Sequence, residues 1–504
     1  MSNDDPTLPA SFGASLNNAR VFVRRSGAPR PEARYVIYWM QIHRRLFSNY
    51  ALEYAVLAAN SLGLPLLVLE ALRCDYPWAS VRFHQFLLEG MQEHLRITTE
   101  RGFNYYAYAE RSAGEGSGLL ESLCEHAAVL ISDEFPAYII PVHNRAIARK
   151  LDIPFFTVDA NGILPLSLSE RAPYSAYIFR KLVQKSFRSC YGAPPEHDPL
   201  ALLKNRSRLK IPTSISERFP RADNLLKGLP QSIHELPLDR TVRAIERSGT
   251  RAAALRRLDE FLKSGLGRYG AERNHPDSQV SSGLSPYLHF GRISAHEILA
   301  AVFEAQPQNW SLAKAKDNRG SKGFLNGDSN IEDFFDELVV WRETGYHFCH
   351  HTRNYDRFDS LPNWARNTLH YHARDRREHV YDLDSLAAAQ THDEIWNAAQ
   401  RQLRTEGVIH NYLRMLWGKK ILEWTPDPLA ALETLIELNN RYSIDGRNPN
   451  SYSGVFWTLG RFDRPWQERP IFGKIRYMSS EATRRKVRLR EYLSRYGDQS
   501  KFAF

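Results

Sequence analysis

Two neighbouring runs near the start of the chain, RYVIYWM at residues 34–40 and LPLLVLEAL at residues 64–72, indicate its fold class. Both runs are short, apolar and rich in β-branched or aromatic residues, which is typical of buried strands. Three more runs of this kind follow, namely NYYAYAE (104–110), AAVLISDE (127–134) and IPFFTVDA (153–160). Longer amphipathic stretches, such as residues 81–102 and 139–151, separate the runs. This alternation predicts a Rossmann-like parallel sheet flanked by helices. No GxGxxG follows the first of these runs, so the predicted sheet does not by itself indicate that a dinucleotide binds.

The second half of the chain has a different pattern. From about residue 241 onward, apolar residues recur at helical spacing and no strand-like run is found. We therefore expect two domains, with a flexible tail at 1–30, an α/β domain at 31–190, an interdomain linker at 191–240 and an all-helical domain at 241–504.

The composition of the 504-residue chain is that of a folded protein, with 43% hydrophobic and 25% charged residues. No stretch is apolar and long enough for a membrane span, and the first residues lack the apolar core of a secretion signal. The four cysteines are scattered without a CxxC pair, which fits a reducing compartment and disfavours a thiolate zinc site. We expect a cytoplasmic protein that does not act at a membrane.

The net charge of +10 is weak evidence for a polyanionic partner, because it could simply keep the protein in solution. Its distribution is more informative. The last thirty-odd residues are rich in basic side chains and poor in carboxylates, and the basic ones include Lys474, Arg476, Arg484, Arg485, Lys486, Arg488, Arg490 and Arg495. A patch of this kind binds phosphates, although a solvated helix face explains the segment equally well.

Tryptophans concentrate in the helical half, where eight of the ten lie after residue 300. Trp417 and Trp424 are seven residues apart in a helical pattern, which places them on one face about 10 Å apart along the axis. That separation suits electron hopping between indole rings. Spacing alone favours packing, because aromatic residues at helical intervals are usually core residues.

Two polar segments of the helical half are candidates for a binding site. Residues 281–294 combine serines and glycine with a proline at a helix start, a turn that can cradle a diphosphate or be an ordinary connection. Residues 438–457 form a polar loop between apolar runs, which is typical of a functional loop. Arg414 and Asp445 are expected partners, because a buried arginine needs a carboxylate. HFCHH at 347–351 does not match a metal-ligand spacing, so we expect surface or capping histidines.

Seven motifs of the helical half carry a family resemblance. In order between residues 285 and 479 they are SPYLHFG, FFDELVVWRE, THDEIWNAA, LRMLWGKKILEW, LNNRYSIDGRNPNSYSG, FDRPW and GKIRYMS. In these motifs the chain resembles the class II cyclobutane pyrimidine dimer photolyases of the photolyase/cryptochrome family. The match is dense over the helical half and loose over the α/β half.

The resemblance implies the photolyase architecture, an α/β domain followed by an all-helical domain that binds FAD. It also implies a light-driven lyase that binds UV-damaged DNA and flips a pyrimidine dimer out of the duplex. In the family, reduced FAD passes one electron to the dimer under blue or near-ultraviolet light and recovers it once the cyclobutane ring has split. Aromatic walls suit such a pocket, because they offset the cost of unstacking the flipped bases. We expect a monomer.

The motifs also imply which residues hold the flavin. The positions near its phosphates and ribityl chain match Tyr269, Ser281, Ser282, Gly283, Leu284 and Ser285. Asn439 matches the residue that faces flavin N5, and Arg414 with Asp445 matches the ion pair beside the isoalloxazine. A neutral amide at Asn439 suits either flavin protonation state, whereas an aspartate there would offer a proton. The asparagine therefore favours repair over signalling.

On the substrate side, the resemblance implies that Glu337 hydrogen-bonds the dimer and that Trp341 and Trp457 wedge it by apolar contact. Met415 lies where a thioether packs against the lesion. The positions that grip the lesion strand or fill the gap in the duplex match Arg273, Asn274, Arg464 and Trp466. The family's route for photoreducing oxidised FAD matches Trp396, Trp417 and Trp424.

The resemblance weakens after the first strand, where the family usually has an acidic and Asn-Trp-bearing stretch. In this chain the same region contains His43, Arg44, Arg45 and Tyr50. Family members with a second chromophore, such as a deazaflavin antenna, bind it in the α/β domain. The altered segment leaves the presence of an antenna open.

Two alternative functions remain. A cryptochrome-like blue-light receptor would use the same flavin and tryptophans to change a partner interface, but it would not need the four pocket groups Glu337, Trp341, Met415 and Trp457 together. Repair of the 6-4 lesion would place histidines at the pocket, and none stands at the matched substrate positions. The retained pocket favours repair of cyclobutane dimers.

Overall fold

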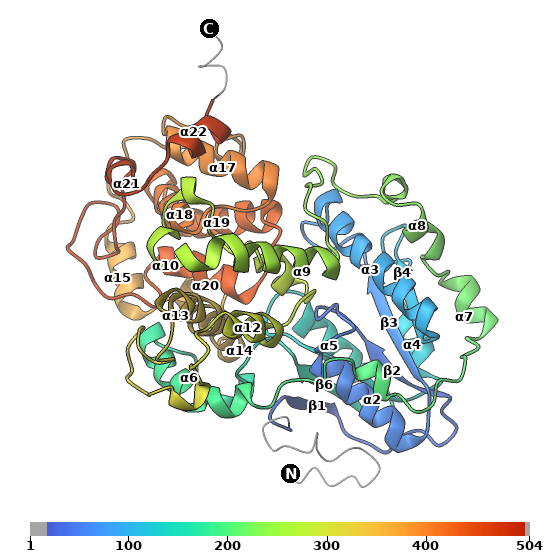
Figure 1. The fold of residues 1–504 in the computed structure, drawn as a ribbon. Coiled ribbons are helices and arrows are strands. Elements are labelled where there is room, and N and C mark those ends of the chain that lie inside the picture. Colours follow the sequence, from blue (N-terminus) through green and yellow to red (C-terminus); the bar gives the residue numbers. More distant parts are fainter. Residues whose placement is uncertain (1–17, 499–504) are drawn as a thin grey trace. The chain divides into compact units, whose positions relative to one another are not determined.

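The computed structural model describes residues 18–498 and contains two compact units (Figure 1). Unit 1 runs to Leu168 and includes Ser186–Arg256 and Leu284–Ala301, and the rest of the chain forms unit 2. The units therefore interleave along the chain, which differs from the consecutive domains expected at 31–190 and 241–504. One physical reason is an ion pair within unit 2, in which Arg180 contacts both carboxylate oxygens of Asp336 at 2.8 and 2.9 Å.

Unit 1 contains a six-stranded sheet in the order β1-β6-β5-β2-β3-β4. Its strands are β1 (Val21–Arg25), β2 (Tyr35–Trp39), β3 (Leu66–Leu72), β4 (Asn104–Ala109), β5 (Ala127–Glu134) and β6 (Phe155–Asp159). All neighbouring pairs except β1 and β6 are parallel. The predicted Rossmann-like sheet is confirmed, and β1 makes it a mixed sheet.

Strand β1 corrects the prediction of a flexible tail over residues 1–30. Val21 to Arg25 pair antiparallel with β6, from Val21 opposite Val158 to Arg25 opposite Phe155. The segment reads VFVRR, whose five residues with two arginines give little strand signal, and its partner is more than 130 residues away in sequence. Residues 1–17 of the expected tail lie outside the described residues.

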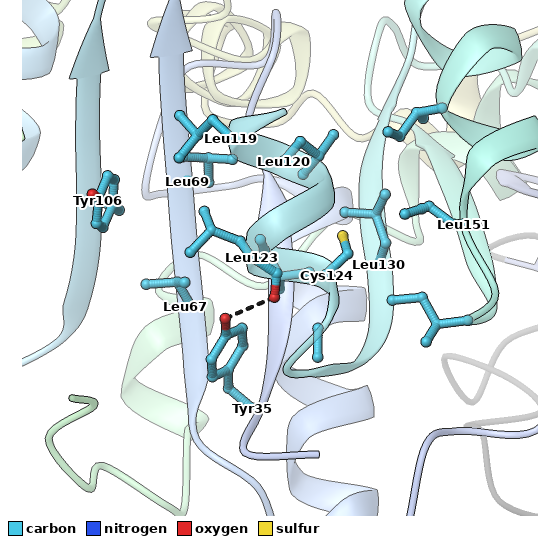
Figure 2. Packing of buried hydrophobic residues seen from close by; sticks show 14 of the residues in the cluster. Tyr35, Leu67, Leu69, Tyr106, Leu119, Leu120, Leu123, Cys124, Leu130 and Leu151 are labelled. Atoms are coloured by element: carbon cyan, nitrogen blue, oxygen red, sulfur yellow. Dashed lines mark hydrogen bonds between the residues drawn. The ribbon is translucent and has the colours of Figure 1, made fainter. Parts of the chain in front are cut away.

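Helices connect the parallel strands and cover the sheet. They are α2 (Tyr50–Leu62), α3 (Val81–Arg101), α4 (Leu119–Cys124) and α5 (Ile140–Lys150). Figure 2 shows one side of the core, where Leu67 and Leu69 of β3 lie near Leu119 and Leu123 of α4. The Tyr35 hydroxyl in this cluster donates a hydrogen bond of 2.8 Å to the Leu123 carbonyl oxygen. The only polar atom of the buried Tyr35 side chain is therefore satisfied.

The stretch expected to be an interdomain linker, residues 191–240, belongs to unit 1. It contains the short helices α7 (Thr213–Arg218) and α8 (Asp223–Lys227). Phe219 and Leu226 are fully buried, and the Tyr106 hydroxyl donates to the Phe219 carbonyl oxygen at 2.6 Å. Prolines and short helices hid this packing, because neither gives a clear hydrophobic period.

Helices dominate the remaining chain, and the described residues after β6 add no further strand to the sheet. They are α6 (Ala176–Tyr191), α9 (Arg251–Glu260), α10 (Tyr269–Glu272), α11 (Ser285–His289), α12 (Ala295–Glu304), α13 (Ser329–Phe335), α14 (Arg342–His351), α15 (Asn363–Tyr371), α16 (Leu383–Ala387), α17 (Glu394–Glu406), α18 (Asn411–Trp424), α19 (Pro428–Tyr442), α20 (Pro449–Thr458), α21 (Ser480–Lys486) and α22 (Arg490–Tyr496). Within residues 18–498, every helix is too short or too polar to cross a membrane.

Glycines let α14 and α18 approach helix α20 closely. A Cβ on Gly345 of α14 would lie 2.7 Å from Ser453 Oγ, and one on Gly418 of α18 would lie 2.6 Å from Thr458 Cγ2. Such distances exclude any side chain larger than hydrogen without a shift of the helices. The contacts fix α14, α18 and α20, and α18 and α20 carry five of the predicted site residues: Arg414, Met415, Trp417, Trp424 and Trp457.

Candidate active site

Two tryptophans form the centre of the candidate substrate pocket. Trp341 ends a π-helical segment, Asp336–Trp341, and Trp457 lies near the end of α20. Their rings are stacked with centroids 4.7 Å apart and planes at 13°. Both residues are of intermediate burial, so each keeps a minor part of its surface accessible. The structure thus brings the predicted pair together with part of each ring open.

Glu337 lies about one turn before Trp341 in the same π-helical segment. Such π-helical turns are frequent at functional sites. Its carboxylate forms an ion pair with Arg273, and the Arg273 guanidinium carbon lies 5.6 Å from the centre of the Tyr269 ring. Burial raises the pKa of the Glu337 carboxyl, and the Arg273 charge acts in the opposite direction. Arg273 therefore helps to keep ionised a carboxylate that burial would neutralise.

A second group of predicted residues surrounds the end of α19. The Arg414 guanidinium donates a hydrogen bond of 3.0 Å to Asn439 Oδ1 and lies 3.6 Å from the Asp445 carboxylate. Asn439 Nδ2 donates to Ser451 Oγ of α20 at 2.6 Å, which fixes the orientation of its amide. The predicted Arg414–Asp445 pair is present, and one guanidinium joins it to Asn439.

The serine-rich turn at 281–285 leads into α11, which begins at Ser285. Gly283 has a φ of +63°, which favours glycine, and the Arg257 guanidinium donates to the carbonyl oxygens of Ser281 and Ser282 at 2.7 Å each. Leu284 is buried, whereas Ser281 and Ser285 are exposed. The turn is therefore held through its carbonyls, with the two outer serines at the surface.

The side chains around Asn439 and the serine-rich turn at 281–285 have hydrogen-bonding groups that fit FAD. A guanidinium, a carboxylate and an amide offer both donors and acceptors, as the carbonyls and N–H of an isoalloxazine require. Hydroxyl groups and a glycine in a left-handed conformation suit a phosphate. Arg414 keeps about a quarter of its side chain accessible, so its guanidinium is not fully used within the protein.

The three predicted relay tryptophans form one buried cluster. Trp396 of α17 stacks on Trp417 with centroids 6.5 Å apart and planes at 3°, and it contacts Trp424 edge-on at 5.7 Å. Trp396 Nε1 donates to the Trp417 carbonyl oxygen at 3.0 Å. Trp396 therefore bridges the two tryptophans that lie seven residues apart on α18.

The remaining predicted residues lie at the edges of the site. Met415 is half-buried on α18 directly after Arg414, and Asn274 is exposed beside Arg273. Trp466 is 42% exposed, and the Arg464 guanidinium carbon lies 5.6 Å from the centre of its ring. An exposed tryptophan with a neighbouring arginine is suited to a nucleic acid surface.

Sequence reasoning missed several supporting residues. Ser451 lies inside the polar segment 438–457, so its position gave a signal, but its bond to Asn439 needed the packing of α19 on α20. Gln400 Oε1 accepts the Trp417 indole N–H at 2.9 Å, and Tyr381 packs 5.6 Å from Trp424. Arg257 has no sequence signal, because nothing in its helix distinguishes it from other exposed arginines.

The histidines of HFCHH correct another expectation. They lie on α14, and His347 is buried with its Nδ1 2.6 Å from Ser169 Oγ, which also lies 3.0 Å from His351 Nε2. The expected surface or capping role is wrong for His347, because the Phe179 ring of α6 packs 4.8 Å from its imidazole and buries it. No group of three or more histidines, cysteines or carboxylates able to hold a metal occurs in residues 18–498.

The switch point of the sheet, between β2 and β5, is the usual ligand site of such sheets. Here one oxygen of Asp133 accepts backbone N–H groups of Gln41, Ile42 and His43 at 2.8, 2.7 and 2.9 Å. Its other oxygen accepts the Tyr38 hydroxyl at 2.7 Å. The protein's own carboxylate therefore occupies the set of N–H groups that could have held an anion.

The altered segment after β2 is built into the core of unit 1. Arg44 pairs with the buried Glu70 at 2.9 Å, and Arg45 donates to carbonyl oxygens of Ser48 and Gly291 at 3.0 and 3.2 Å. His43 and Tyr50 are buried as well. The altered segment is therefore bonded within unit 1.

Comparisons with known proteins agree with the geometry. A curated deoxyribodipyrimidine photo-lyase of Methanothermobacter thermautotrophicus is 35% identical over 94% of this chain and 97% of its own length. Those of Potorous tridactylus and Arabidopsis thaliana are each 31% identical, over 96% and 95% of this chain and 86% and 93% of their own lengths. No family model matches the chain.

A solved structure supports the fold. The crystal structure of a bacterial class III photolyase from Agrobacterium tumefaciens aligns with a TM-score of 0.63 at 17% identity and covers 94% of this chain and 88% of that one. At this identity the likeness concerns the fold alone. Together with the near-complete coverage of the curated relatives, it leads to one conclusion: the chain belongs to the deoxyribodipyrimidine photo-lyase family of enzymes.

Proposed function

We propose that this chain is a class II photolyase that repairs cyclobutane pyrimidine dimers in DNA. The observation that carries the proposal is the stacked pair Trp341–Trp457 with Glu337 one turn away. Two partly open indole rings offer apolar walls to a flipped pair of bases, and a neighbouring carboxylate can accept hydrogen bonds from a thymine. The names of the curated relatives support the same activity.

FAD, bound in its reduced form and excited by light, would supply the electron that splits the dimer and take it back afterwards. Arg414, Asn439 and Asp445 would hold its ring system, with Ser451 fixing the Asn439 amide. The turn at 281–285 and Tyr269 would hold its phosphates and ribityl chain. The protein's main tasks are thus to position the donor and the lesion and to exclude water.

Glu337 and the tryptophan pair would position the dimer. Arg273 holds Glu337 in the ion pair seen here, so lesion binding would exchange this internal partner for the thymine N–H groups and free Arg273 for a phosphate. Trp396, Trp417 and Trp424 would return oxidised FAD to its reduced form. The proposal includes no second chromophore at the switch point, because Asp133 and the Arg44–Glu70 pair fill that region.

Lesion choice tests this proposal. Oligonucleotides with a single cyclobutane dimer or a single 6-4 lesion are illuminated with the reduced protein, and the products are separated by chromatography. We expect restored thymines from the dimer alone. Restoration from the 6-4 lesion alone, or from neither, would overturn the proposal. Glu337→Gln should lower the repair yield, and the surface variant Glu433→Gln serves as its matched control.

A further inference from the structure

A loop between α20 and α21, residues 461–477, presents Trp466 to solvent and is called the Trp466 loop. The Arg464 and Arg476 guanidinium carbons lie 5.6 and 5.2 Å from the centre of the Trp466 ring. The loop has five basic and two acidic residues. The family resemblance implies that Arg464 and Trp466 of this loop grip the lesion strand or fill the gap in the duplex, so within the proposed function the position of the loop affects the affinity for DNA.

The Trp466 loop packs tightly against α15. Its turn is closed by two hydrogen bonds between the backbones of Arg469 and Gly473, at 3.0 and 2.7 Å. The Lys474 N–H donates to Thr368 Oγ1 at 2.9 Å, and a Cβ on Gly473 would lie 2.1 Å from the same oxygen. No side chain fits between the turn and α15. The position of the loop therefore depends on the contact between this turn and the helix.

An imidazole joins the loop to the end of α15. His372 Nδ1 lies 2.6 Å from Asp375 Oδ2, and His372 Nε2 lies 2.9 Å from Glu468 Oε1 of the loop. The same oxygen of Asp375 accepts the Ile471 N–H of the loop at 2.7 Å. Both ring nitrogens thus face carboxylate oxygens. Both can donate only when the ring carries two protons and a positive charge.

The charges around His372 favour that protonated form. Burial lowers the pKa of His372, but its hydrogen bonds to Glu468 and Asp375 outweigh burial and raise the pKa above the usual value. Asp375 is in turn held ionised, because its bonds from Ile471 and His372 lower the pKa of its carboxyl; Arg377 also faces it. The Tyr371 ring packs 5.1 Å from His372.

We propose that protonated His372 is a positioning residue for DNA binding, which holds the Trp466 loop against α15 through Asp375 and Glu468. The role of the loop rests on the proposed function, whereas its attachment rests on the contacts above. Because the folded-state pKa is raised, the clamp is complete below the ordinary histidine pKa of about 6.5 and is lost as the pH rises through the higher folded-state value. DNA affinity should fall over the same range.

The first test measures the dissociation constant for a dimer-containing duplex between pH 6 and pH 9. The variants are His372→Gln, Glu468→Gln and, as the matched control, His370→Gln at an exposed position of the same helix. We expect affinity of the natural chain and the control to fall about tenfold with rising pH. The His372→Gln and Glu468→Gln variants should show a much flatter profile, and His372→Gln should bind weakly throughout.

The repair yield at saturating DNA should be equal in all four proteins, since the clamp acts on binding and not on the chemistry. If His372→Gln keeps both the affinity and the pH profile of the natural chain, the proposal is wrong. A general folding defect would instead lower the yield at saturation and the unfolding midpoint, and would also contradict a positioning role.

The second test does not use DNA and separates this inference from the proposed function. Amide hydrogen exchange of Ile471 and Lys474 is compared between the natural chain, His372→Gln and His370→Gln at the same pH. Faster exchange in His372→Gln alone supports the clamp, even if the protein should fail to repair DNA. Unchanged exchange would overturn it, and faster exchange with unchanged DNA affinity would show that the loop does not position the DNA.

Discussion

Arg414 is the residue on which the candidate flavin site depends most, because one guanidinium contacts both Asn439 and Asp445. A lysine keeps the charge but cannot form this two-sided contact. We expect Arg414→Lys to retain the fold and to lose FAD at least about tenfold more readily than the natural chain. The FAD released on denaturation, counted per protein chain, measures the effect. Arg485→Lys, at an exposed site of α21, should retain FAD fully.

Lys419 of α18 carries a buried amine that is hydrogen-bonded to a backbone carbonyl. Its Nζ donates to the Thr458 carbonyl oxygen at 2.5 Å, and burial lowers the pKa of Lys419 to about 7. The unfolded chain binds this proton up to about pH 10. Folding therefore opposes protonation, so this residue lowers stability as the pH falls from about 10 to 7, by up to about 4 kcal/mol.

Replacing Lys419 with methionine tests this effect. Lys419→Met removes the amine at similar volume, so it should raise the free energy of unfolding more at pH 7 than at pH 9.5. Urea unfolding curves of both proteins at the two pH values measure the difference. An equal effect at both pH values would show that Lys419 is protonated in the folded state, and Lys263→Met, at an exposed site, controls for general charge.

At the scale of elements, the packing of α17 on α18 creates the tryptophan cluster. Trp396 stands between Trp417 and Trp424 with centroid distances of 6.5 and 5.7 Å, which suits stepwise electron transfer. We expect Trp417→Phe and Trp424→Phe to block photoreduction of oxidised FAD while sparing repair by chemically reduced protein. Absorption spectra during illumination measure the first effect. Normal photoreduction in both variants would refute the relay, and Trp310→Phe is the control outside it.

Elements differ in how well the sequence predicts them. The parallel strands were predicted because runs such as 127–134 are wholly apolar at their centre and are buried on both faces. Strand β1 was missed because only its pairing with β6 makes it a strand. The π-helical turn at Asp336–Trp341 could not be predicted either, since an extra residue in a helix leaves no clear mark in its period.

Site residues follow the same division. The motifs predicted Trp341, Trp457, Arg414 and Asp445, and the structure places them in the expected pairs. Spacing on α18 alone could not place Trp396 between the other two tryptophans, because that contact depends on a second helix. The burial of Arg44 beside Glu70 was equally hidden, since a basic run usually lies at the surface.

For the molecule as a whole, the net charge of +10 should make DNA affinity depend on the salt concentration. Each phosphate contact lowers the logarithm of the binding constant by about 0.9 per tenfold rise in salt. We expect affinity for dimer-containing duplex to fall steeply with salt, and the double variant Arg464→Gln, Arg476→Gln to reduce the slope by about 1 to 2. Fluorescence anisotropy over a salt series measures both slopes. An affinity independent of salt would exclude a basic docking surface.

The proposed mechanism requires unit 2 to hold an excited flavin close enough to a dimer to split it, and light-dependent repair of a defined lesion measures this. The reduced protein is mixed with a dimer-containing oligonucleotide, and thymine absorbance is followed under blue light and in darkness. We expect the absorbance to recover under light and not in darkness, and to recover little with the Trp341→Ala, Trp457→Ala double variant. No recovery under light, with FAD bound and reduced, would contradict it.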